Sequence, residues 1–346
     1  MPVMPNLLRY TLFVATLCLA LSACTTTAPR AASGPAPVWP QGSAAPRIAF
    51  VQSINSAADL GIQRAALARI ADWLFGEEET RLVRPMAVLK VADALYVADA
   101  GVNGVHRFDS KRGAYEVIRG EGETVLPSPV ALASGGDGTV YIADSRLGKL
   151  LRVAPGSLVA VPLALDVPVG QPTGLAFDAT TQRIYVTDTL AHCVLVYSTD
   201  GRLLSRIGQR GTGPGQFNFP TLLWLGPDRR LYVTDTLNFR VQVLDAERKF
   251  ITTFGRQGDS SGDAARPKGV ATDSEGHIYV VDGAFHAFQI FDTAGRYLLG
   301  VGERGSDPGE FWLPAGIAID AQDRIYIADS YNRRVQVFQY LTGGLQ

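Results

Sequence analysis

The sequence predicts an all-β fold, a six-bladed β-propeller of four-stranded antiparallel blades. A phrase of an aliphatic residue, Tyr, Val or Ile, a small or branched residue and Asp occurs six times, every 44 to 47 residues. Short alternating apolar runs and turn residues fill each interval, which is typical of a propeller blade. The aspartates that end the six copies are Asp99, Asp144, Asp188, Asp235, Asp282 and Asp329.

Residues 1–23 are predicted to be a lipoprotein signal peptide. The apolar run from Tyr10 to Leu21 is shorter than the roughly 20 residues that a membrane-spanning helix needs. It leads into Leu-Ser-Ala-Cys24, which resembles the lipobox of bacterial lipoproteins, so Cys24 is the predicted lipidation site. The alternative is an ordinary cleaved signal peptide with an incidental cysteine. Because Thr25 follows the cysteine, the resemblance implies a lipid-anchored protein of the cell envelope, at the outer membrane and facing the periplasm.

The remaining chain divides into a tether and a folded part. Residues 24–47 are rich in Thr, Ala and Pro and are predicted to be a semi-extended tether, whereas residues 48–346 are predicted to be the propeller. With 32 basic and 33 acidic residues, the chain lacks the strongly basic character of nucleic-acid-binding domains, so no nucleic acid partner is expected. Cys193 is the single cysteine of the folded part, which excludes an intrachain disulfide there.

The ring is predicted to close through a strand from the N-terminal side. The sixth repeat ends after its third strand, so its outer strand has to come from elsewhere in the chain. Residues 48–54 form a strand-like run that no repeat uses, and we expect them to pair with residues 335–338. Closure would remove the exposed edge of an open sheet.

One amphipathic helix is predicted between this strand and the first repeat, over residues 56–75. Ser56 and Asp59 resemble a capping box. Four apolar residues then fall on one helical face: Leu60, Leu67, Ile70 and Leu74. The helix is interpreted as a cover packed on the propeller or, alternatively, as an element that docks a partner.

The repeats themselves are predicted over residues 85–338. In the last repeat, residues 314–320, 324–329 and 334–339 read as its three strands, and earlier repeats add a fourth, such as residues 250–254. A proline is tolerated at the first residue of a strand, where no ladder donor is needed. The prolines expected to open the inner strands are Pro85, Pro127, Pro172, Pro220, Pro267 and Pro314.

Two phrases of this repeat resemble NHL repeats. They are Ala-Asp-Ser-Tyr-Asn332-Arg-Arg-Val-Gln-Val-Phe338 and Thr-Asp-Thr-Leu-Asn238-Phe-Arg-Val-Gln-Val-Leu244. The link Gly-Thr-Gly-Pro-Gly215-Gln-Phe-Asn-Phe-Pro220 has the same character. The resemblance implies a propeller whose relatives include protein- and RNA-binding modules, bacterial envelope proteins and a few enzymes such as amidating lyases, so it does not by itself imply one function.

The repeated aspartates are interpreted as structural, and no catalytic residue is predicted. A residue that recurs in every blade serves the blade, because an Asp at the end of a strand can accept backbone N–H groups of the following turn. It can also pair with an arginine five residues later. This pairing is expected between Asp235 and Arg240 and between Asp329 and Arg334.

The histidines do not predict a metal centre or any cofactor. His192 and His286 each lie four residues after a repeat aspartate and are interpreted as turn residues. The four histidines do not assemble a three-ligand zinc site in the sequence, which weakens the resemblance to the lyases, since these depend on a histidine-bound metal. No G-x-S-x-G nucleophile elbow is present.

One end of the propeller is the candidate binding face. In antiparallel blades the turn after the second strand and the link to the next blade lie at the same end. Arginine and aromatic residues, which interface hot spots favour, gather in these segments, Phe217 among them. The alternative is that the arginines pair with the repeat aspartates and the aromatics pack between blades. The candidate residues are Arg210, Arg256, Arg304, Arg266, Lys268, Phe285, His286 and Trp312.

These observations predict a lipid-anchored binding or scaffold propeller of the cell envelope. Its partner is expected to be an envelope protein or an anionic glycan or peptide, and its membrane contact the N-terminal lipid. The alternative is a propeller enzyme, a lyase or hydrolase with or without a metal, that acts at the central channel. Trp224, which stands where other blades have Ala131, Ala176, Ala271 and Ala318, is expected to pack against the adjacent blade.

Overall fold

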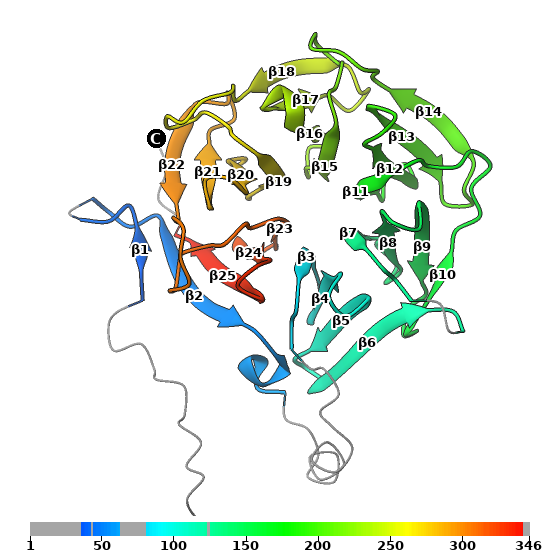
Figure 1. Ribbon diagram of the computed structural model, residues 1–346, viewed down its shortest axis with the longest axis horizontal. Coiled ribbons are helices and arrows are strands. Elements are labelled where there is room, and N and C mark those ends of the chain that lie inside the picture. Colours follow the sequence, from blue (N-terminus) through cyan, green and yellow to red (C-terminus); the bar gives the residue numbers. More distant parts are fainter. Residues whose placement is uncertain (1–35, 43, 63–80, 123–124, 342–346) are drawn as a thin grey trace, which may run out of the picture. The chain divides into compact units, whose positions relative to one another are not determined.

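The protein folds as six blades around a central axis, as the computed structural model shows (Figure 1). The structure describes residues 36–42, 44–62, 81–122 and 125–341. Each inner strand contacts the inner strands of both neighbouring blades, so the six blades form a closed ring. Within these residues, no helix has the length and apolar character needed to cross a membrane. The predicted signal peptide and Cys24 lie outside the described residues and stay predictions.

The first three blades each contain four strands in sequence order. Blade one consists of β3 (Pro85–Val91), β4 (Ala94–Asp99), β5 (Gly104–Asp109) and β6 (Ala114–Gly120). Blade two consists of β7 (Pro129–Ser134), β8 (Val140–Asp144), β9 (Lys149–Val153) and β10 (Val159–Pro162). Blade three consists of β11 (Pro172–Asp178), β12 (Arg183–Asp188), β13 (Cys193–Ser198) and β14 (Leu203–Ile207).

The last three blades follow the same order until the ring closes. Blade four consists of β15 (Pro220–Leu225), β16 (Leu231–Asp235), the 3-10 turn η3 (Thr236–Asn238), β17 (Arg240–Leu244) and β18 (Phe250–Phe254). Blade five consists of β19 (Pro267–Thr272), β20 (Ile278–Asp282), β21 (Ala287–Phe291) and β22 (Tyr297–Val301). Blade six begins with β23 (Ile317–Ile319), β24 (Arg324–Asp329) and β25 (Arg334–Tyr340).

The predicted closing strand is confirmed. Strand β2 (Ile48–Ile54) pairs antiparallel with β25, from Ile48 opposite Tyr340 to Ile54 opposite Val335. A further short strand, β1 (Val38–Trp39), pairs with β2 and makes blade six five-stranded. Strand β1 lies inside the segment predicted as a tether, and Trp39 packs at 5.8 Å from the Phe338 ring, so this end of the segment belongs to the blade.

The predicted amphipathic helix is not seen. The described part of that segment is a 3-10 turn, η2 (Ala57–Leu60), which ends at Gly61 in the left-handed conformation, with φ +71°. The expected contact between Ser56 and Asp59 does form, because the Asp59 carboxylate accepts the Ser56 N–H at 2.9 Å. A left-handed glycine directly after the first turn ends a helix. Residues 63–75 of the predicted helix lie outside the described residues.

The inner strand of blade two begins two residues later than expected. Pro129, not Pro127, stands opposite the repeat aspartate Asp144, as the corresponding prolines of blades one, three, four and five stand opposite theirs. For the same reason Ala133, not Ala131, stands opposite the repeat tyrosine and is the counterpart of Trp224. Two closely spaced prolines allowed either register, and only the strand pairing distinguishes them. In blade six the inner strand begins at Ile317, after the expected Pro314.

Neighbouring blades pack through apolar side chains on their facing surfaces. Tyr279 and Phe288 of blade five are fully buried against Ile325 and Phe338 of blade six. Each such side chain stabilises the fold by about 1.5–3 kcal/mol through removal of apolar surface from water. Blades one and two are joined further by parallel pairing of their outer strands β6 and β10. The ring is therefore held together between blades as well as within them.

Candidate functional site

The repeat aspartates lie at one end of the ring, which we call the turn face. It carries the turns after the second strands and the links between blades. In each blade the carboxylate accepts backbone N–H groups of the incoming link. These donors are Val83 and Arg84, Ser128, Gly170 and Gln171, Asn218, Ala265 and Arg266, and Trp312. The aspartates therefore fasten each link to its blade, as a structural interpretation requires.

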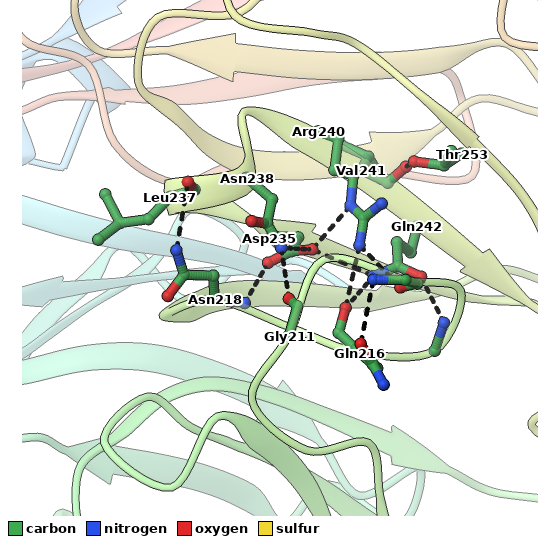
Figure 2. A network of polar contacts seen from close by, with 12 residues as sticks. Gly211, Gln216, Asn218, Asp235, Leu237, Asn238, Arg240, Val241, Gln242 and Thr253 are labelled. Atoms are coloured by element: carbon green, nitrogen blue, oxygen red, sulfur yellow. Dashed lines mark hydrogen bonds and ion pairs between the residues drawn. The ribbon is translucent and has the colours of Figure 1, made fainter.

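Blade four shows the fullest version of this network (Figure 2). The fully buried Asp235 carboxylate accepts hydrogen bonds from the Asn218 N–H at 2.6 Å, Asn238 Nδ2 at 2.8 Å and Gln242 Nε2 at 3.1 Å. Arg240 Nε donates to the same carboxylate at 2.8 Å, which confirms the expected ion pair. Blade six repeats the arrangement, with Arg334 Nε at 2.8 Å from the Asp329 carboxylate.

In blades three, four and six, the residue after the aspartate joins one blade to the next. Its hydroxyl donates a hydrogen bond to the carbonyl of the proline that opens the neighbouring inner strand. The bonds run from Thr189 to Pro220 at 2.7 Å, from Thr236 to Pro267 at 3.1 Å and from Ser330 to Pro85 at 2.6 Å. The polar groups at these positions are thus used by the fold and are not available for chemistry.

The turn histidines are structural as well. His192 Nδ1 accepts the Phe219 N–H and His286 Nδ1 accepts the Leu313 N–H, both at 3.1 Å. A neutral imidazole that accepts at Nδ1 carries its proton on Nε2, so neither ring nitrogen is free to bind a metal as placed. Burial lowers the pKa of His286, and the positive charge of Arg304 lowers it further, which favours this neutral form.

The residues present do not fit the histidine-bound metal of the lyases. Within the described ranges, no three His, Cys, Asp or Glu side chains are grouped so that they could hold a metal ion. His106 is buried in blade one and His277 pairs with Asp273 at the opposite end of blade five, at 2.8 Å. No step that depends on a metal follows from this arrangement.

The centre of the ring holds a cavity of about 220 Å³. Inner-strand residues from all six blades line it, and none of the described lining residues has an ionisable side chain. Trp224 is among them, and its Nε1 donates to Thr272 Oγ1 of blade five at 3.0 Å, which confirms packing against the adjacent blade. The channel therefore offers apolar surface but no acid–base pair for the enzyme alternative.

A second cavity, of about 270 Å³, lies where the channel meets the turn face, and we call it the mouth pocket. Three cationic residues line it, Arg84 from blade one and Arg266 and Lys268 from blade five, and of these Arg84 and Arg266 are exposed whereas Lys268 is half-buried. Blade six lies between these two blades, and Tyr331 from its turn completes the wall. Two of the eight candidate residues are thus brought together with two that the sequence analysis missed.

Glycines draw the inner strands together at this point. A Cβ at Gly269 would lie 2.8 Å from the Ala315 carbonyl oxygen, and one at Gly316 would lie 2.6 Å from that of Met86. Both distances are shorter than any real Cβ contact, so only glycine permits this approach. The close approach sets Lys268, Ala315 and Met86 beside one another in the pocket wall.

The cations of the mouth pocket have no acidic partner among the described residues. Within the described part of the chain, Arg84, Arg266 and Lys268 form no ion pair, and the pocket lining contains no carboxylate. The repeat aspartate Asp282 is fully buried and accepts the backbone N–H groups of its turn and link instead. Burial lowers the pKa of Lys268, the charge of Arg266 lowers it further, and Asp282 opposes both.

Aromatic rings extend the site outward from the pocket. Trp312 and Tyr331 are 44% and 54% exposed, and their ring centroids are 5.7 Å apart. Phe285 and His286 are half-buried in the turn of blade five. The contact of His286 with the Leu313 N–H places that turn directly beside Trp312. Trp312, His286 and Phe285 therefore belong to one neighbourhood of the turn face.

The three link arginines do not join this group. Arg210 and Arg304 are exposed and lie near the start of their links between blades. The backbone of each pairs through a β-bridge with that of a buried phenylalanine, Phe217 or Phe311. Arg256 forms an ion pair with Asp263 at 2.8 Å, so it pairs with an acid of its own link and not with a repeat aspartate. None of the three lines the mouth pocket. Phe217 is fully buried between blades and is not part of the face.

Arg84 and Tyr331 could have been found by aligning the repeats with one another. Arg84 precedes the first proline of blade one as Arg266 precedes that of blade five, and Tyr331 lies two residues after its repeat aspartate. The signal was a departure from the repeat, since most other blades have an uncharged residue at the position of Arg84 and no other blade has an aromatic residue at the position of Tyr331.

Comparisons with known proteins agree with this architecture. A family model described as a 6-bladed beta-propeller matches residues 166–253 and 268–344. No curated protein matches the sequence. The chain is a six-bladed β-propeller protein. The comparisons do not show that its repeats are NHL repeats.

Solved structures of propellers resemble this one in fold. A protein of unknown function from Bacteroides thetaiotaomicron has a TM-score of 0.61 at 14% identity, over 85% of this chain and 75% of that chain. An auxiliary nutrient binding protein from the same organism has a TM-score of 0.60 at 14% identity, over 76% and 70%. Virginiamycin B lyase from Staphylococcus aureus has a TM-score of 0.54 at 15% identity, over 75% and 96%. At these identities the likeness concerns the fold alone.

Proposed function

We propose that this protein is a binding module of the bacterial cell envelope, held by a lipid on Cys24, which binds its ligand or protein partner through the turn face. The observation that carries the proposal is the mouth pocket, where Arg84, Arg266 and Lys268 form no ion pair with any described residue and exposed aromatic rings adjoin them. Arginine and aromatic side chains around a concave centre are typical of binding hot spots.

Two further observations favour binding over catalysis. The repeat aspartates and turn histidines, which a catalytic reading would use, are engaged by the backbone. The ionisable side chains in the described lining of the mouth pocket are those of Arg84, Arg266, Lys268 and Tyr331, so the lining offers no carboxylate or imidazole for general acid–base catalysis. A propeller of similar fold carries the name auxiliary nutrient binding protein, an example of a binding role on this architecture.

The proposal is tested by affinity purification of the tagged full chain from gently solubilised envelopes, with every bound protein and small molecule identified. The test variant is Trp312→Ala/Tyr331→Ala. The matched control is Leu204→Ala/Ile251→Ala, which removes exposed apolar side chains from outer strands. We expect a species that the wild type and the control retain and the test variant loses. Equal retention by all three proteins would show that the turn face is not the binding surface.

The link arginines are separated from the mouth by a second variant, Arg210→Ala/Arg304→Ala. If the partner is a protein that covers the whole turn face, this variant weakens capture as well, because both side chains are exposed on the links. If the ligand is confined to the mouth, capture is unchanged.

A further inference from the structure

We propose that the mouth pocket is an oxyanion site, which binds a phosphate or a pair of carboxylates on a small ligand or chain end. The inference rests on the proposed binding function of the turn face and adds the chemistry of the ligand. It starts from three cationic side chains that line one cavity of about 270 Å³ without a carboxylate in the lining.

The repeat itself shows that the fold does not require these charges. The residue before the first proline of a blade is Ser128, Gln171 or Phe219 in blades two to four, where blades one and five have Arg84 and Arg266. The residue after that proline is Val130, Thr173 or Thr221 in blades two to four, where blade five has Lys268. The six equivalent positions in blades two to four show that the strand forms without a charge there. The cations occur only in the two blades that flank blade six.

The geometry makes these cations receptive to an anion. Lys268 is half-buried, and a buried ammonium beside another cation is unfavourable unless a negative charge joins it. The repeat aspartates of blades one and five form no ion pair with these cations among the described residues, because backbone N–H groups occupy their oxygens. The charge of Asp282 offsets the unfavourable environment of Lys268 only in part, since the pKa of Lys268 stays lowered. Two guanidinium groups can bind oxygen pairs in bidentate geometry while the ammonium adds a point charge.

The size of the pocket limits the ligand. A cavity of about 270 Å³ is below the range of roughly 300–1,000 Å³ that drug-sized ligands occupy. It therefore suits a single anionic head group or one charged residue or sugar. Three positive charges match a group with two or more negative oxygens better than a single carboxylate. Any remaining part of the ligand would meet the exposed rings of Tyr331 and Trp312.

Isothermal titration of the purified protein tests this inference, with inorganic phosphate and malonate as separate probes in chloride buffer of constant ionic strength. The variant Arg266→Gln/Lys268→Thr copies the residues that blade three has at these positions, Gln171 and Thr173. The control Arg183→Gln/Lys249→Thr removes the same charges from exposed positions at the opposite end of the blades. Thermal unfolding of each protein serves as the folding check.

We expect saturable binding of at least one probe, with a dissociation constant of about 1 mM or tighter. The pocket variant should bind at least tenfold more weakly and the control should bind as the wild type does. The unfolding midpoint of the pocket variant should equal or exceed that of the wild type. Binding of phosphate alone identifies a phosphorylated ligand and binding of malonate alone a carboxylated one.

Absence of saturable binding with both probes, or equal affinity in the folded pocket variant, overturns the oxyanion site. This failure is distinguishable from failure of the proposed function. The purification experiment changes Trp312 and Tyr331 and leaves all three cations in place, so the turn face can bind a partner even where the mouth binds no anion.

Discussion

At the scale of single residues, position in the repeat decides what a polar side chain does. Asp235 and Lys268 both lie at the turn face, yet Asp235 is enclosed by donors whereas Lys268 is without a described acidic partner. The aspartate has a counterpart in every blade and the lysine has none. A recurring residue satisfies the backbone of its blade, and a residue that breaks the repeat is free to serve binding.

The aspartate network leads to a prediction about stability. Asp235→Ala should lower the free energy of unfolding by about 3–5 kcal/mol, because it leaves Arg240 and the Asn218 N–H without their buried acceptor. Denaturant unfolding measures the change. The control is Asp228→Ala in the same blade, whose ion pair with Arg230 is exposed and should be worth less than about 1 kcal/mol. Similar losses in both variants would contradict a structural role for the network.

At the scale of elements, the closing strand β2 shows how burial and pairing combine. Its ends, Ile48 and Ile54, are fully buried in the core, whereas Val51 between them is 48% exposed. The strand contributes both the hydrogen bonds that close the ring and the apolar contacts that hold blade six.

Strand β2 therefore supplies a matched pair of substitutions. Ile48→Ala should destabilise the protein by about 2–5 kcal/mol, since it leaves a cavity in a core that cannot collapse fully. Val51→Ala removes a side chain that is largely in water and should cost less than about 1 kcal/mol. Denaturant midpoints of the two variants test this. Equal effects would mean that the closing strand is not packed as described.

The prediction of a helix was wrong for the part of the segment that the structure describes, and the reason lies in the local sequence. Residues 57–75 have helical spacing of apolar residues, but Gly61 adopts a left-handed conformation after a single turn. Hydrophobic periodicity does not register such a stop, because a glycine inside a helical pattern is costly but tolerated. The blade strands were easier to predict, since each is short and framed by turn residues.

At the scale of the whole molecule, six similar blades form a ring that is asymmetric at its mouth. The ring brings blade five, blade six and blade one together at the mouth, although blades one and five are far apart in the chain. No described residue that lines the channel below has an ionisable side chain, whereas the mouth carries cationic residues from blades one and five.

The proposed lipid anchor at Cys24 gives a further prediction. Cys24→Ala should release the protein from membranes into the soluble fraction, because the lipid is the proposed anchor. Membrane fractionation followed by detection of the tagged protein measures this, with Cys193→Ala as the control that keeps the lipidation site. A Cys24→Ala variant that still fractionates with membranes like the wild type would exclude the lipoprotein interpretation.

The sequence by itself determined the number of blades, the positions of most strands, the closing strand and the structural role of the repeat aspartates. These features follow from local periodicity and from residues within a few positions of one another. Only the tertiary structure decided which charges meet at the mouth, which link arginine is paired, and that Phe217 is buried. Arg84 and Lys268 become neighbours of one pocket through ring closure, and a contact between distant repeats leaves no local pattern in the chain.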